Sequence, residues 1–356
     1  MNSFQVNLAK RSYSIDISPG MIKKCPALLA EHNHGQKWII ISQHNLMELF
    51  GFDFLKELKK NGFDIDFITL PIGEAAKSIN EYRRIISQMI EFSCDRKTSI
   101  ICLGGGVVGD VGGFVASSFM RGINYFQIPT TLLAMVDSSI GGKTGINLSE
   151  GKNLIGSIYQ PKGVLIDPNL LKSLPKEEVN SGISEIIKYG AIWNKEFLYQ
   201  IRSWLMDINN FPFDEAISTS CKIKAEIVSK DENENGLRRI LNFGHTIGHA
   251  IESHLGYGKI RHGEAVALGM KCSGYISEKL NLITKDDLIL LLNIINNLPL
   301  PQLPHIDSNH LLPFIKNDKK AEKGKLNFVV LQNLGNAKTT TKVDEKLIIE
   351  SLKVLH

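Results

Sequence analysis

Hydrophobic and polar residues follow a different pattern in each half of the chain. In the first half, short apolar runs of strand length are separated by segments with the three-to-four-residue periodicity of an amphipathic helix. Strands that alternate with helices predict a parallel α/β sheet with right-handed crossovers, and residues 1–20 predict an antiparallel hairpin added to it. The apolar runs are 38–41, 63–70, 99–103 and 125–128, and the helical segments are 45–60 and 79–92.

The pattern changes near residue 170, after which helical periodicity dominates. We therefore predict an α/β domain over residues 1–170 and a mainly α-helical domain over residues 171–356. The helical segments of the second half are 175–193, 196–207, 214–230, 240–254, 262–280 and 286–297, and strands are predicted only at 325–331 and 338–343.

Composition places the chain among ordinary globular proteins. Its 356 residues are 43% hydrophobic and 22% charged, and a net charge of +4 is too small to indicate a nucleic-acid partner. The five cysteines are scattered and form no C-x-x-C pair, which predicts reduced thiols. No signal-peptide pattern and no apolar run of membrane length is present. We therefore expect a cytoplasmic protein that binds neither nucleic acid nor a membrane.

Polar side chains recur along an otherwise apolar segment in the second half. Arg238, Asn242, His245 and His249 follow one another at steps of three and four residues, which predicts a polar stripe on one helix. Imidazole binds Zn²⁺ well, and a catalytic zinc site needs about three protein ligands. The two histidines are either two metal ligands or one ligand and one acid–base group. Surface histidines on an amphipathic helix are the plainer alternative.

A carboxylate for such a metal site is available on an earlier helix. Glu185 and Lys188 are three residues apart, which is compatible with an ordinary surface ion pair. A set of Glu185, His245 and His262 would instead resemble zinc sites with two histidines and one acidic ligand, which leave a position open for substrate. Lys224 is a further cationic candidate, although on sequence alone it is expected to be a solvated lysine.

A glycine-rich turn, 104–110, follows a predicted strand and opens a predicted helix at 107–119. Glycines at such a turn let backbone N–H groups approach a pyrophosphate at the helix N-terminus. The spacing does not match the ordinary G-x-G-x-x-G fingerprint, so a tight turn without a ligand is the alternative. Asp110 would either contact a cofactor or simply open the helix.

Two further segments carry charged residues at strand ends or in glycine-flanked loops. Glu74 and Lys77 follow a strand at the edge where open α/β sheets bind ligands. Lys143, Lys152 and Asn153 are expected in loops, and Lys143 is a suitable phosphate partner. The string Gly-Gly-Lys-Thr resembles part of a Walker A loop, but the first glycine at the required spacing and a preceding strand are missing, so we do not predict an ATPase.

Taken together, these motifs resemble the 3-dehydroquinate synthase family over residues 37–335. The resemblance implies an N-terminal Rossmann-like NAD-binding α/β domain, a mainly α-helical C-terminal metal-binding domain, an active site in the cleft between them and a homodimer. The motifs that carry it are 104–110, 119–122, 135–144, 151–153, 185–188, 242–249 and 262–264.

The resemblance also implies residue roles. A metal ion, Zn²⁺ or Co²⁺, would be bound by Glu185, His245 and His262, while His249 would form active-site hydrogen bonds rather than bind the metal. Substrate would be contacted by Arg121, Lys143, Asn153, Lys188, Lys224, Arg238, Asn242, His249 and Lys320 (or its neighbour Lys319). NAD would be contacted by Glu74, Lys77, Gly105, Gly106, Asp110, Thr130, Thr131, Asp137, Lys143, Lys152 and Ser173.

The activity implied by the resemblance is conversion of the small sugar phosphate 3-deoxy-D-arabino-heptulosonate 7-phosphate into 3-dehydroquinate and phosphate. Competing hypotheses are a related sugar-phosphate cyclase that makes an inosose or a valiolone, a metal-dependent polyol dehydrogenase, and a cofactor-bound scaffold without activity. The set of Arg238, Asn242 and His249 favours a substrate that bears a carboxylate. One departure concerns the cofactor: Gln43 stands where the family usually has an acidic residue, so a preference for NAD over NADP is less firmly indicated.

Overall fold

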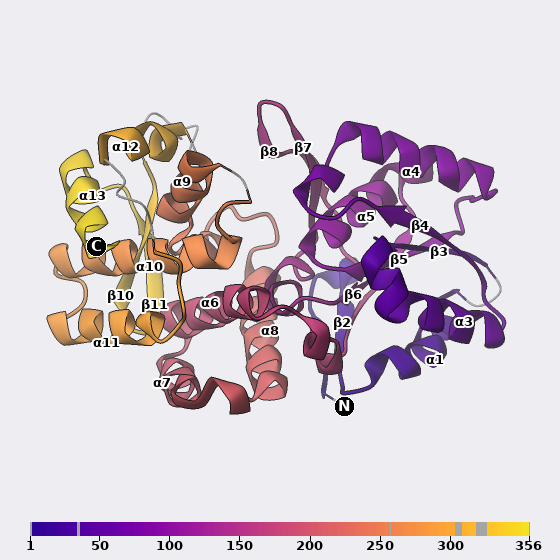
Figure 1. Ribbon diagram of the computed structural model, residues 1–356, viewed down its shortest axis with the longest axis horizontal. Helices are drawn as coiled ribbons and strands as arrows, with labels where there is room; N and C mark the ends of the chain where they lie inside the picture. The colour runs from indigo at the N-terminus through magenta and orange to yellow at the C-terminus, as the bar shows by residue number, and fades with distance from the viewer. Residues whose placement is uncertain (1, 34–35, 257, 303–307, 318–325, 356) are drawn as a thin grey trace. The chain divides into compact units, whose positions relative to one another are not determined.

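The computed structural model of the chain divides into two compact units (Figure 1). Unit 1 comprises Met1–Leu174 and Ile217–Glu232, and unit 2 comprises Pro175–Ala216 and Asn233–His356. The residues that the structure describes are 2–33, 36–256, 258–302, 308–317 and 326–355.

The segment 217–232 lies in unit 1, whereas the sequence pattern assigned it to the second domain. It forms most of α8 (Phe213–Lys230), whose side chains bond to residues more than eighty positions earlier. The thiol of Cys221 donates to the carbonyl of Met135, and the ammonium of Lys224 donates to the carbonyl of Asp137. Helical periodicity predicts that this helix exists, but it carries no information about which core the helix joins.

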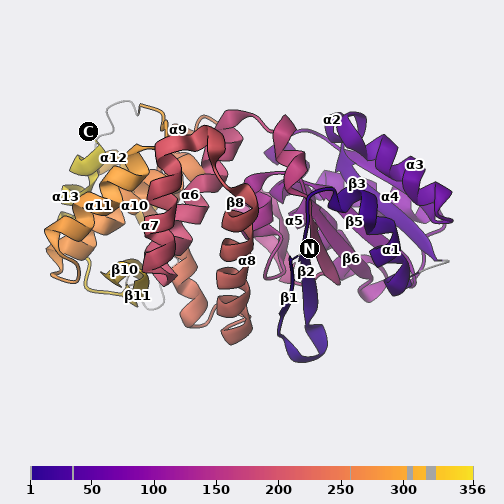
Figure 2. The ribbon, with the colours of Figure 1, turned by 90° about the horizontal axis from the view of Figure 1, so that it is seen from below.

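A seven-stranded sheet forms the centre of unit 1, in the order β1-β2-β9-β6-β5-β3-β4. The N-terminal strands β1 and β2 pair antiparallel, as predicted, and can be followed in indigo in Figure 2. All other neighbouring strands run parallel, which confirms the predicted α/β sheet. The strands are β1 (Asn2–Val6), β2 (Tyr13–Ile17), β3 (Lys37–Gln43), β4 (Asp64–Leu70), β5 (Ser99–Gly104), β6 (Asn124–Pro129) and β9 (Gly163–Ile166).

The inner strands β3, β5 and β6 are buried on both faces, which explains why they contain continuous apolar runs. Ile39 and Ile41 join a core cluster with residues of α4 and α5. Trp38 points to the opposite face, where its ring lies 5.6 Å from the rings of Phe63 and Phe126. The helical elements of unit 1 before α8 are η1 (Ala9–Arg11), α1 (Met21–Asn33), α2 (His44–Leu46), η2 (Met47–Gly51), α3 (Phe52–Lys60), η3 (Glu74–Ala76), α4 (Ile79–Glu91), α5 (Gly106–Ser118), η4 (Phe119–Arg121), η5 (Ala134–Ser138) and η6 (Pro168–Ser173).

A second hairpin of unit 1 was not predicted. Strands β7 (Lys143–Leu148) and β8 (Gly151–Ile158) pair antiparallel where glycine-flanked loops were expected. A Cβ atom on Gly156 would lie 2.1 Å from the carbonyl oxygen of Thr144, so glycine is needed where the two strands approach closely. The glycines that suggested loops therefore allow the two backbones to pair.

Unit 2 is mainly helical, as predicted, with one two-stranded sheet formed by β10 and β11. Its core combines residues of α9, α10, α12 and α13 with residues of β10. Its elements are α6 (Lys176–Trp193), α7 (Lys195–Trp204), η7 (Leu205–Asn210), η8 (Leu237–Asn242), α9 (His245–Leu255), α10 (His262–Lys279), α11 (Lys285–Asn296), α12 (Ser308–Asn317), α13 (Glu345–Ser351), η10 (Leu352–Leu355), β10 (Phe328–Asn333) and β11 (Asn336–Thr340).

The predicted helix 240–254 was wrong at its start. The 3₁₀ helix η8 ends at Asn242, and α9 begins only at His245. Gly244 separates them with a φ of 80°, in the left-handed region that favours glycine. Arg238 and Asn242 therefore do not share one helical stripe with His245, although all of them belong to unit 2.

No described helix combines the length and the apolar character needed to cross a membrane. The five cysteines are free thiols, and all of them are buried. Burial raises the pKa of Cys94 to about 11 and that of Cys272 to about 12, and it also raises the pKa of Cys25, Cys102 and Cys221.

Native protein is therefore expected to react slowly with a thiol reagent, because the reactive species is the thiolate and these thiols are both buried and protonated. The measurement is the time course of reaction with an aromatic disulfide reagent at neutral pH, with and without denaturant. All five thiols should react promptly after unfolding. A fast native phase equivalent to one thiol would identify a cysteine that opens to solvent.

Candidate active site

The sheet of unit 1 places a ligand site at the carboxyl ends of β3 and β5. The chain leaves β3 towards β4 on one side, while β5 lies on its other side, so the strand order reverses between β3 and β5. Ligands of open α/β sheets bind at such a switch point. Gln43 ends β3 there, and its side-chain amide donates to the carbonyl of Pro71 at 3.1 Å. The neutral residue noted in the sequence thus lies at the edge where a cofactor ribose is expected.

Gly105 and Gly106 follow β5 and open α5, and we call this turn the glycine cradle. A Cβ on Gly106 would lie 2.9 Å from the hydroxyl oxygen of Ser138, and a Cβ on Gly105 would lie 3.1 Å from Thr131. The hydroxyl oxygens of Thr130 and Ser138 are buried and have no hydrogen-bond partner within the described ranges. Such hydroxyls beside a helix N-terminus suit the phosphates of a dinucleotide. Ser138 was not predicted, although it directly follows the predicted Asp137 in the sequence.

Lys77 is the centre of a polar network in the same unit. Its side chain is 5% exposed, and its ammonium lies 2.7 Å from a carboxylate oxygen of Asp110 and 2.5 Å from the amide oxygen of Asn153. Glu74 lies 3.8 Å from the ammonium and accepts a hydrogen bond of 2.7 Å from Asn147. Burial raises the pKa of Asp110, and Lys77 opposes that rise. Lys77 thus lies beside Glu74 and Asp110, and all three were predicted to contact the cofactor. Its third neighbour, Asn153, was predicted to contact the substrate.

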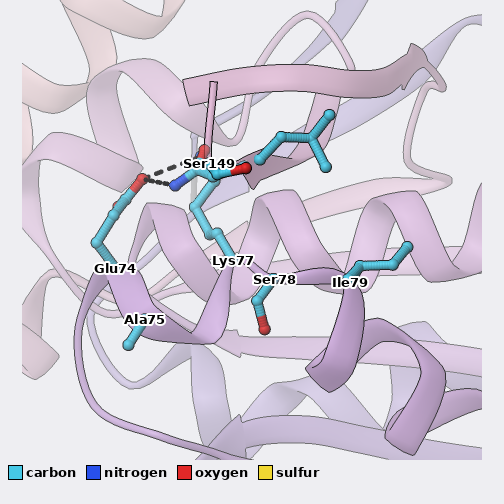
Figure 3. Close-up of a pocket in the computed structure, with 8 residues that line it drawn as sticks. Glu74, Ala75, Lys77, Ser78, Ile79 and Ser149 are labelled. Carbon is cyan, nitrogen blue, oxygen red and sulfur yellow. Dashed lines mark hydrogen bonds and ion pairs between the residues drawn. The ribbon is translucent and has the colours of Figure 1, made fainter. Parts of the chain in front are cut away.

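A pocket opens beside this network, with a volume of about 370 Å³. It is lined by residues of 74–79 and by residues 147–149 at the tip of the β7–β8 hairpin. Figure 3 shows Glu74 and Lys77 together at this pocket. Ser78 is one of the lining residues, and it caps α4 by accepting a hydrogen bond from the backbone of Glu81.

Replacing Lys77 with methionine is expected to lower the free energy of unfolding by about 2–4 kcal/mol, because Asp110 loses its cation. The pKa of Asp110 should rise further, so the folded protein would hold a proton that the unfolded chain releases. Stability then falls as the pH rises, and the loss should be larger near about pH 8 than near about pH 5. Chemical unfolding at both pH values measures this difference. Adding Asp110→Asn should recover part of the loss; equal losses at both pH values would contradict the pairing.

Lys224 is buried, so the expectation of a solvated lysine was wrong. The residue is 5% exposed, and its ammonium lies 2.6 Å from both the carbonyl oxygen and a carboxylate oxygen of Asp137. Asp137 belongs to η5, a single π-helical turn, which is a conformation often found at functional sites. A predicted substrate residue and a predicted cofactor residue are therefore in direct contact.

Arg121 lies in a turn with unusual backbone angles. Met120 has a φ of 49° and Arg121 a φ of 70°, both in the left-handed region. Such residues cost about 1–3 kcal/mol each, and they cluster at binding sites. The hydroxyl of Tyr159 donates a hydrogen bond of 3.0 Å to the carbonyl of Ile123, which stabilises the chain directly after this turn.

The remaining predicted contact residues lie on other segments of the chain. Lys143 and Lys152 lie on the β7–β8 hairpin. The hydroxyl of Ser173 donates to the carbonyl of Leu170 within its own 3₁₀ helix, at 3.1 Å. Lys320 and Lys319 lie outside the described residues.

Three elements of unit 2 bring together the predicted metal ligands. Glu185 lies on α6 and is fully buried, and His245 and His262 are the first residues of α9 and α10. One carboxylate oxygen, Oε1 of Glu185, lies 3.7 Å from Nε2 of His245 and 3.8 Å from Nε2 of His262. That oxygen has no hydrogen-bond partner in the part of the chain that the structure describes. A buried carboxylate oxygen facing two imidazole nitrogens fits a divalent cation.

Both histidines are held with Nε2 towards this carboxylate. Nδ1 of His245 lies 3.2 Å from the carbonyl oxygen of Phe243, and Nδ1 of His262 lies 3.2 Å from a carboxylate oxygen of Glu252. A proton on Nδ1 satisfies each contact and leaves the Nε2 lone pair for a metal. Burial, together with the positive charge of Lys188, holds the pKa of His245 well below its usual value. His245 is therefore neutral, the form that binds metals.

His249 lies against the same cluster. Its ring centroid is 5.3 Å from that of His245 and 5.7 Å from that of His262, and one ring nitrogen from each of the three histidines lies within 4.8 Å of the others. The geometry thus allows a three-histidine site as well as the predicted set with Glu185. Both sets share His245 and His262, and the buried charge of Glu185 favours the predicted one.

Further charged residues surround this cluster. The ammonium of Lys188 pairs with Glu185 one turn away on α6, and both side chains are buried. The guanidinium of Arg238 is also buried, with the residue 1% exposed. The amide of Asn242 donates to Glu234 at 2.6 Å, which places a carboxylate that was not predicted beside a predicted substrate residue. No spacing in the sequence pointed to Glu234, because it lies in an irregular segment outside any helix.

Comparison with known proteins gives matches over nearly the whole chain. Residues 67–181 match the family described as 3-dehydroquinate synthase N-terminal, and residues 182–321 match 3-dehydroquinate synthase C-terminal. The 3-dehydroquinate synthase of Rippkaea orientalis is 42% identical over 354 residues, covering 96% of each chain. That of Thermoanaerobacter pseudethanolicus is 42% identical over 357 residues, covering 99% of this chain and all of its own.

Solved structures of similar fold belong to other enzymes. A 2-deoxy-scyllo-inosose synthase complexed with carbaglucose-6-phosphate, NAD⁺ and Co²⁺ superposes with a TM-score of 0.90 at 26% identity, covering 99% of this chain and all of that one. A 2-epi-5-epi-valiolone synthase from Streptomyces hygroscopicus with bound NAD⁺ and Zn²⁺ gives a TM-score of 0.88 at 25% identity, covering 98% of each chain. A glycerol dehydrogenase from Schizosaccharomyces pombe, at 14% identity and a TM-score of 0.67, shares the fold alone.

Proposed function

Because the chain belongs to the 3-dehydroquinate synthase family, we propose that it converts 3-deoxy-D-arabino-heptulosonate 7-phosphate into 3-dehydroquinate and phosphate. The reaction comprises transient oxidation, phosphate elimination, re-reduction, ring opening and an intramolecular aldol closure, and it belongs to the shikimate pathway of aromatic amino acid biosynthesis. The observation that carries the proposal is the convergence of Glu185 with the Nε2 atoms of His245 and His262. This cluster offers one carboxylate and two imidazoles, which suits a catalytic metal site.

Two cofactors belong to this proposal. NAD would be held in unit 1 by the glycine cradle after β5 and by the network around Lys77, because these offer hydroxyls and a buried cation beside a helix N-terminus. Zn²⁺ or Co²⁺ would be held in unit 2 by Glu185, His245 and His262. Related cyclases with bound NAD⁺ and either Co²⁺ or Zn²⁺ support this pairing of cofactors.

The chain's own residues position the substrate and balance its charge. When bound, NAD takes up and returns a hydride, while a divalent metal ion lowers the pKa of a coordinated hydroxyl. Arg238 presents a buried guanidinium fork that matches a carboxylate in a bidentate manner. Asn242 and His249 add hydrogen-bonding groups in the same unit. Lys188, held one turn from Glu185, supplies an ammonium for substrate oxygens.

Residues of unit 1 would contact the phosphate and the remaining oxygens of the substrate. Arg121 and Lys143 supply cations, and Asn153 supplies an amide that accepts a hydrogen bond from Lys77. Lys224 is anchored by Asp137, which aligns it with the predicted cofactor residues. A ligand with both a phosphate and a carboxylate needs several cations, and charge-assisted hydrogen bonds of this kind are the strong ones.

The experiment is a dual assay of phosphate release and NADH absorbance, with the heptulosonate phosphate, catalytic amounts of NAD and added Zn²⁺ or Co²⁺. Stoichiometric phosphate with no net NADH is expected, because the hydride is returned within each turnover. NADH that accumulates without phosphate would indicate a polyol dehydrogenase. If neither phosphate nor NADH is detected, sugar phosphates without a carboxylate, such as substrates of inosose and valiolone synthases, become the candidate substrates.

We also propose that the protein is cytoplasmic and forms a homodimer. The five buried thiols suit a reducing compartment. The dimer rests on the family resemblance, and light scattering coupled to size-exclusion chromatography tests it by giving the molar mass in solution.

A further inference from the structure

We propose that Glu252 is a positioning residue for the metal site: it orients His262 and supplies negative charge that strengthens metal binding. The inference rests on the proposed metal site of Glu185, His245 and His262. It deepens that proposal by assigning a role to a residue outside the predicted ligands and substrate contacts.

The geometry links Glu252 to the proposed metal ligand His262. A carboxylate oxygen of Glu252, on α9, lies 3.2 Å from Nδ1 of His262, the first residue of α10. Glu252 is 8% exposed, so its carboxylate is held largely out of water, and it gains from a partner that carries a proton. When Nδ1 of His262 carries that proton, Nε2 becomes the metal-binding atom. This is also the atom that lies 3.8 Å from Glu185.

The two histidines are supported in chemically different ways. His245 is held by the backbone carbonyl of Phe243, which is neutral and cannot be removed by substitution, whereas His262 is held by a carboxylate. His262 is also the less enclosed of the two, with its side chain 33% exposed against 11% for His245. His262 therefore depends more on its acidic partner to keep one orientation.

The charge of Glu252 should matter as well as its geometry. Lys188 pairs with Glu185, so its positive charge offsets the negative charge of the acidic ligand of the site. A second buried carboxylate beside a ligand favours a dication and raises the basicity of the imidazole that binds it. A neutral group at position 252 would lose this contribution even if it kept the ring in place.

The test compares wild-type protein with Glu252→Gln and Glu252→Ala. Metal-free protein is titrated with Co²⁺ in competition with a chelator, and the visible spectrum of bound Co²⁺ reports both affinity and ligand geometry. Alanine should weaken Co²⁺ binding by about 10–100-fold, the range typical of lost outer partners of a metal-binding histidine, and glutamine should weaken it less. The Co²⁺ spectrum of the alanine variant should also change, because the ring of His262 is no longer held in one orientation.

Glu178→Gln is the matched control. It removes one carboxylate of the same unit, and that carboxylate pairs with Arg261, next to His262 in the sequence. Its Co²⁺ affinity should remain that of wild type. Thermal unfolding of all the metal-free proteins checks that they are folded, and the nearly isosteric glutamine variant keeps the test available if the alanine variant is unstable.

Wild-type Co²⁺ affinity and spectrum in both Glu252 variants would overturn the proposal. An equal loss in the Glu178→Gln control would also overturn it, because the effect would then be one of general charge. If wild-type protein does not bind Co²⁺, the proposed metal site itself is contradicted, and the role of Glu252 with it. If Co²⁺ binds but the heptulosonate phosphate releases no phosphate, the proposed reaction fails while the role of Glu252 stands.

Discussion

Glu185→Gln is expected to weaken metal binding by more than about 100-fold, beyond the effect of losing an outer partner. An amide is a poor metal ligand, and the substitution removes the negative charge that a buried dication requires. The measurement is metal content after dialysis, together with the dissociation constant for Co²⁺. Because Lys188 loses its partner, the free energy of unfolding should also fall, by about 3–5 kcal/mol.

His249→Gln is the counterpart that decides between the two possible ligand sets. If Glu185, His245 and His262 bind the metal, this variant should keep its metal while turnover falls by about 10²–10⁴-fold, the usual contribution of a positioned acid–base group. Loss of metal from this variant, with retention in Glu185→Gln, would establish the three-histidine set instead. Circular dichroism of both variants checks that the overall helix content is unchanged.

The second large effect is expected from Gly263→Ala. A Cβ atom on Gly263 would lie 2.0 Å from the carbonyl oxygen of Ser181 and 2.6 Å from its carbonyl carbon and Cα, so α10 could not keep its contact with α6. These are backbone atoms, which cannot rotate out of the way. The free energy of unfolding should fall by more than about 3 kcal/mol, at or above the upper end for overpacked sites. Metal affinity should fall too, because the displaced helices carry His262 and Glu185.

Gly274→Ala provides the matched control on the same helix. A Cβ at this position would meet only the ends of two flexible side chains, at 2.9 Å from Leu291 and 3.2 Å from Leu288. Alanine also gains about 1 kcal/mol of helix propensity over glycine, so the net change should be small. Denaturant unfolding and Co²⁺ titration of the two variants side by side measure the contrast. Equal stability of both variants would show that α6 and α10 are not packed as closely as described.

Spacing in the sequence was enough to suggest candidate metal ligands but not to predict how these residues are supported. Glu185, His245 and His262 could be proposed from the chemistry of their side chains, and they do converge. The supporting groups were missed: the carbonyl of Phe243 has no side-chain signature, and Glu252 has the pattern of any partly polar helix position. The predicted stripe failed because a single left-handed residue, Gly244, ends one helix before the next begins.

In unit 1 the apolar runs were sufficient to predict the parallel sheet, because strands buried on both faces leave a continuous signal. Two features had no such signal. The strands of the β7–β8 hairpin are interrupted by glycines that close backbone pairing requires, so they read as loops. The burial of Lys224 depends on a partner, Asp137, far away in the chain, and no local pattern reports that contact.

The return of residues 217–232 to unit 1 has a consequence for how the protein is made. Domains of most nascent chains fold in order of emergence from the ribosome, the N-terminal one first. Here the first unit still lacks α8 when residue 174 has emerged, and the segment 175–216, which belongs to the other unit, is synthesised before the missing helix arrives. Translation must therefore proceed past Glu232 before the first unit is whole. A gene truncated at codon 174 would encode a unit in which Met135 and Asp137 of η5 lack their partners on that helix.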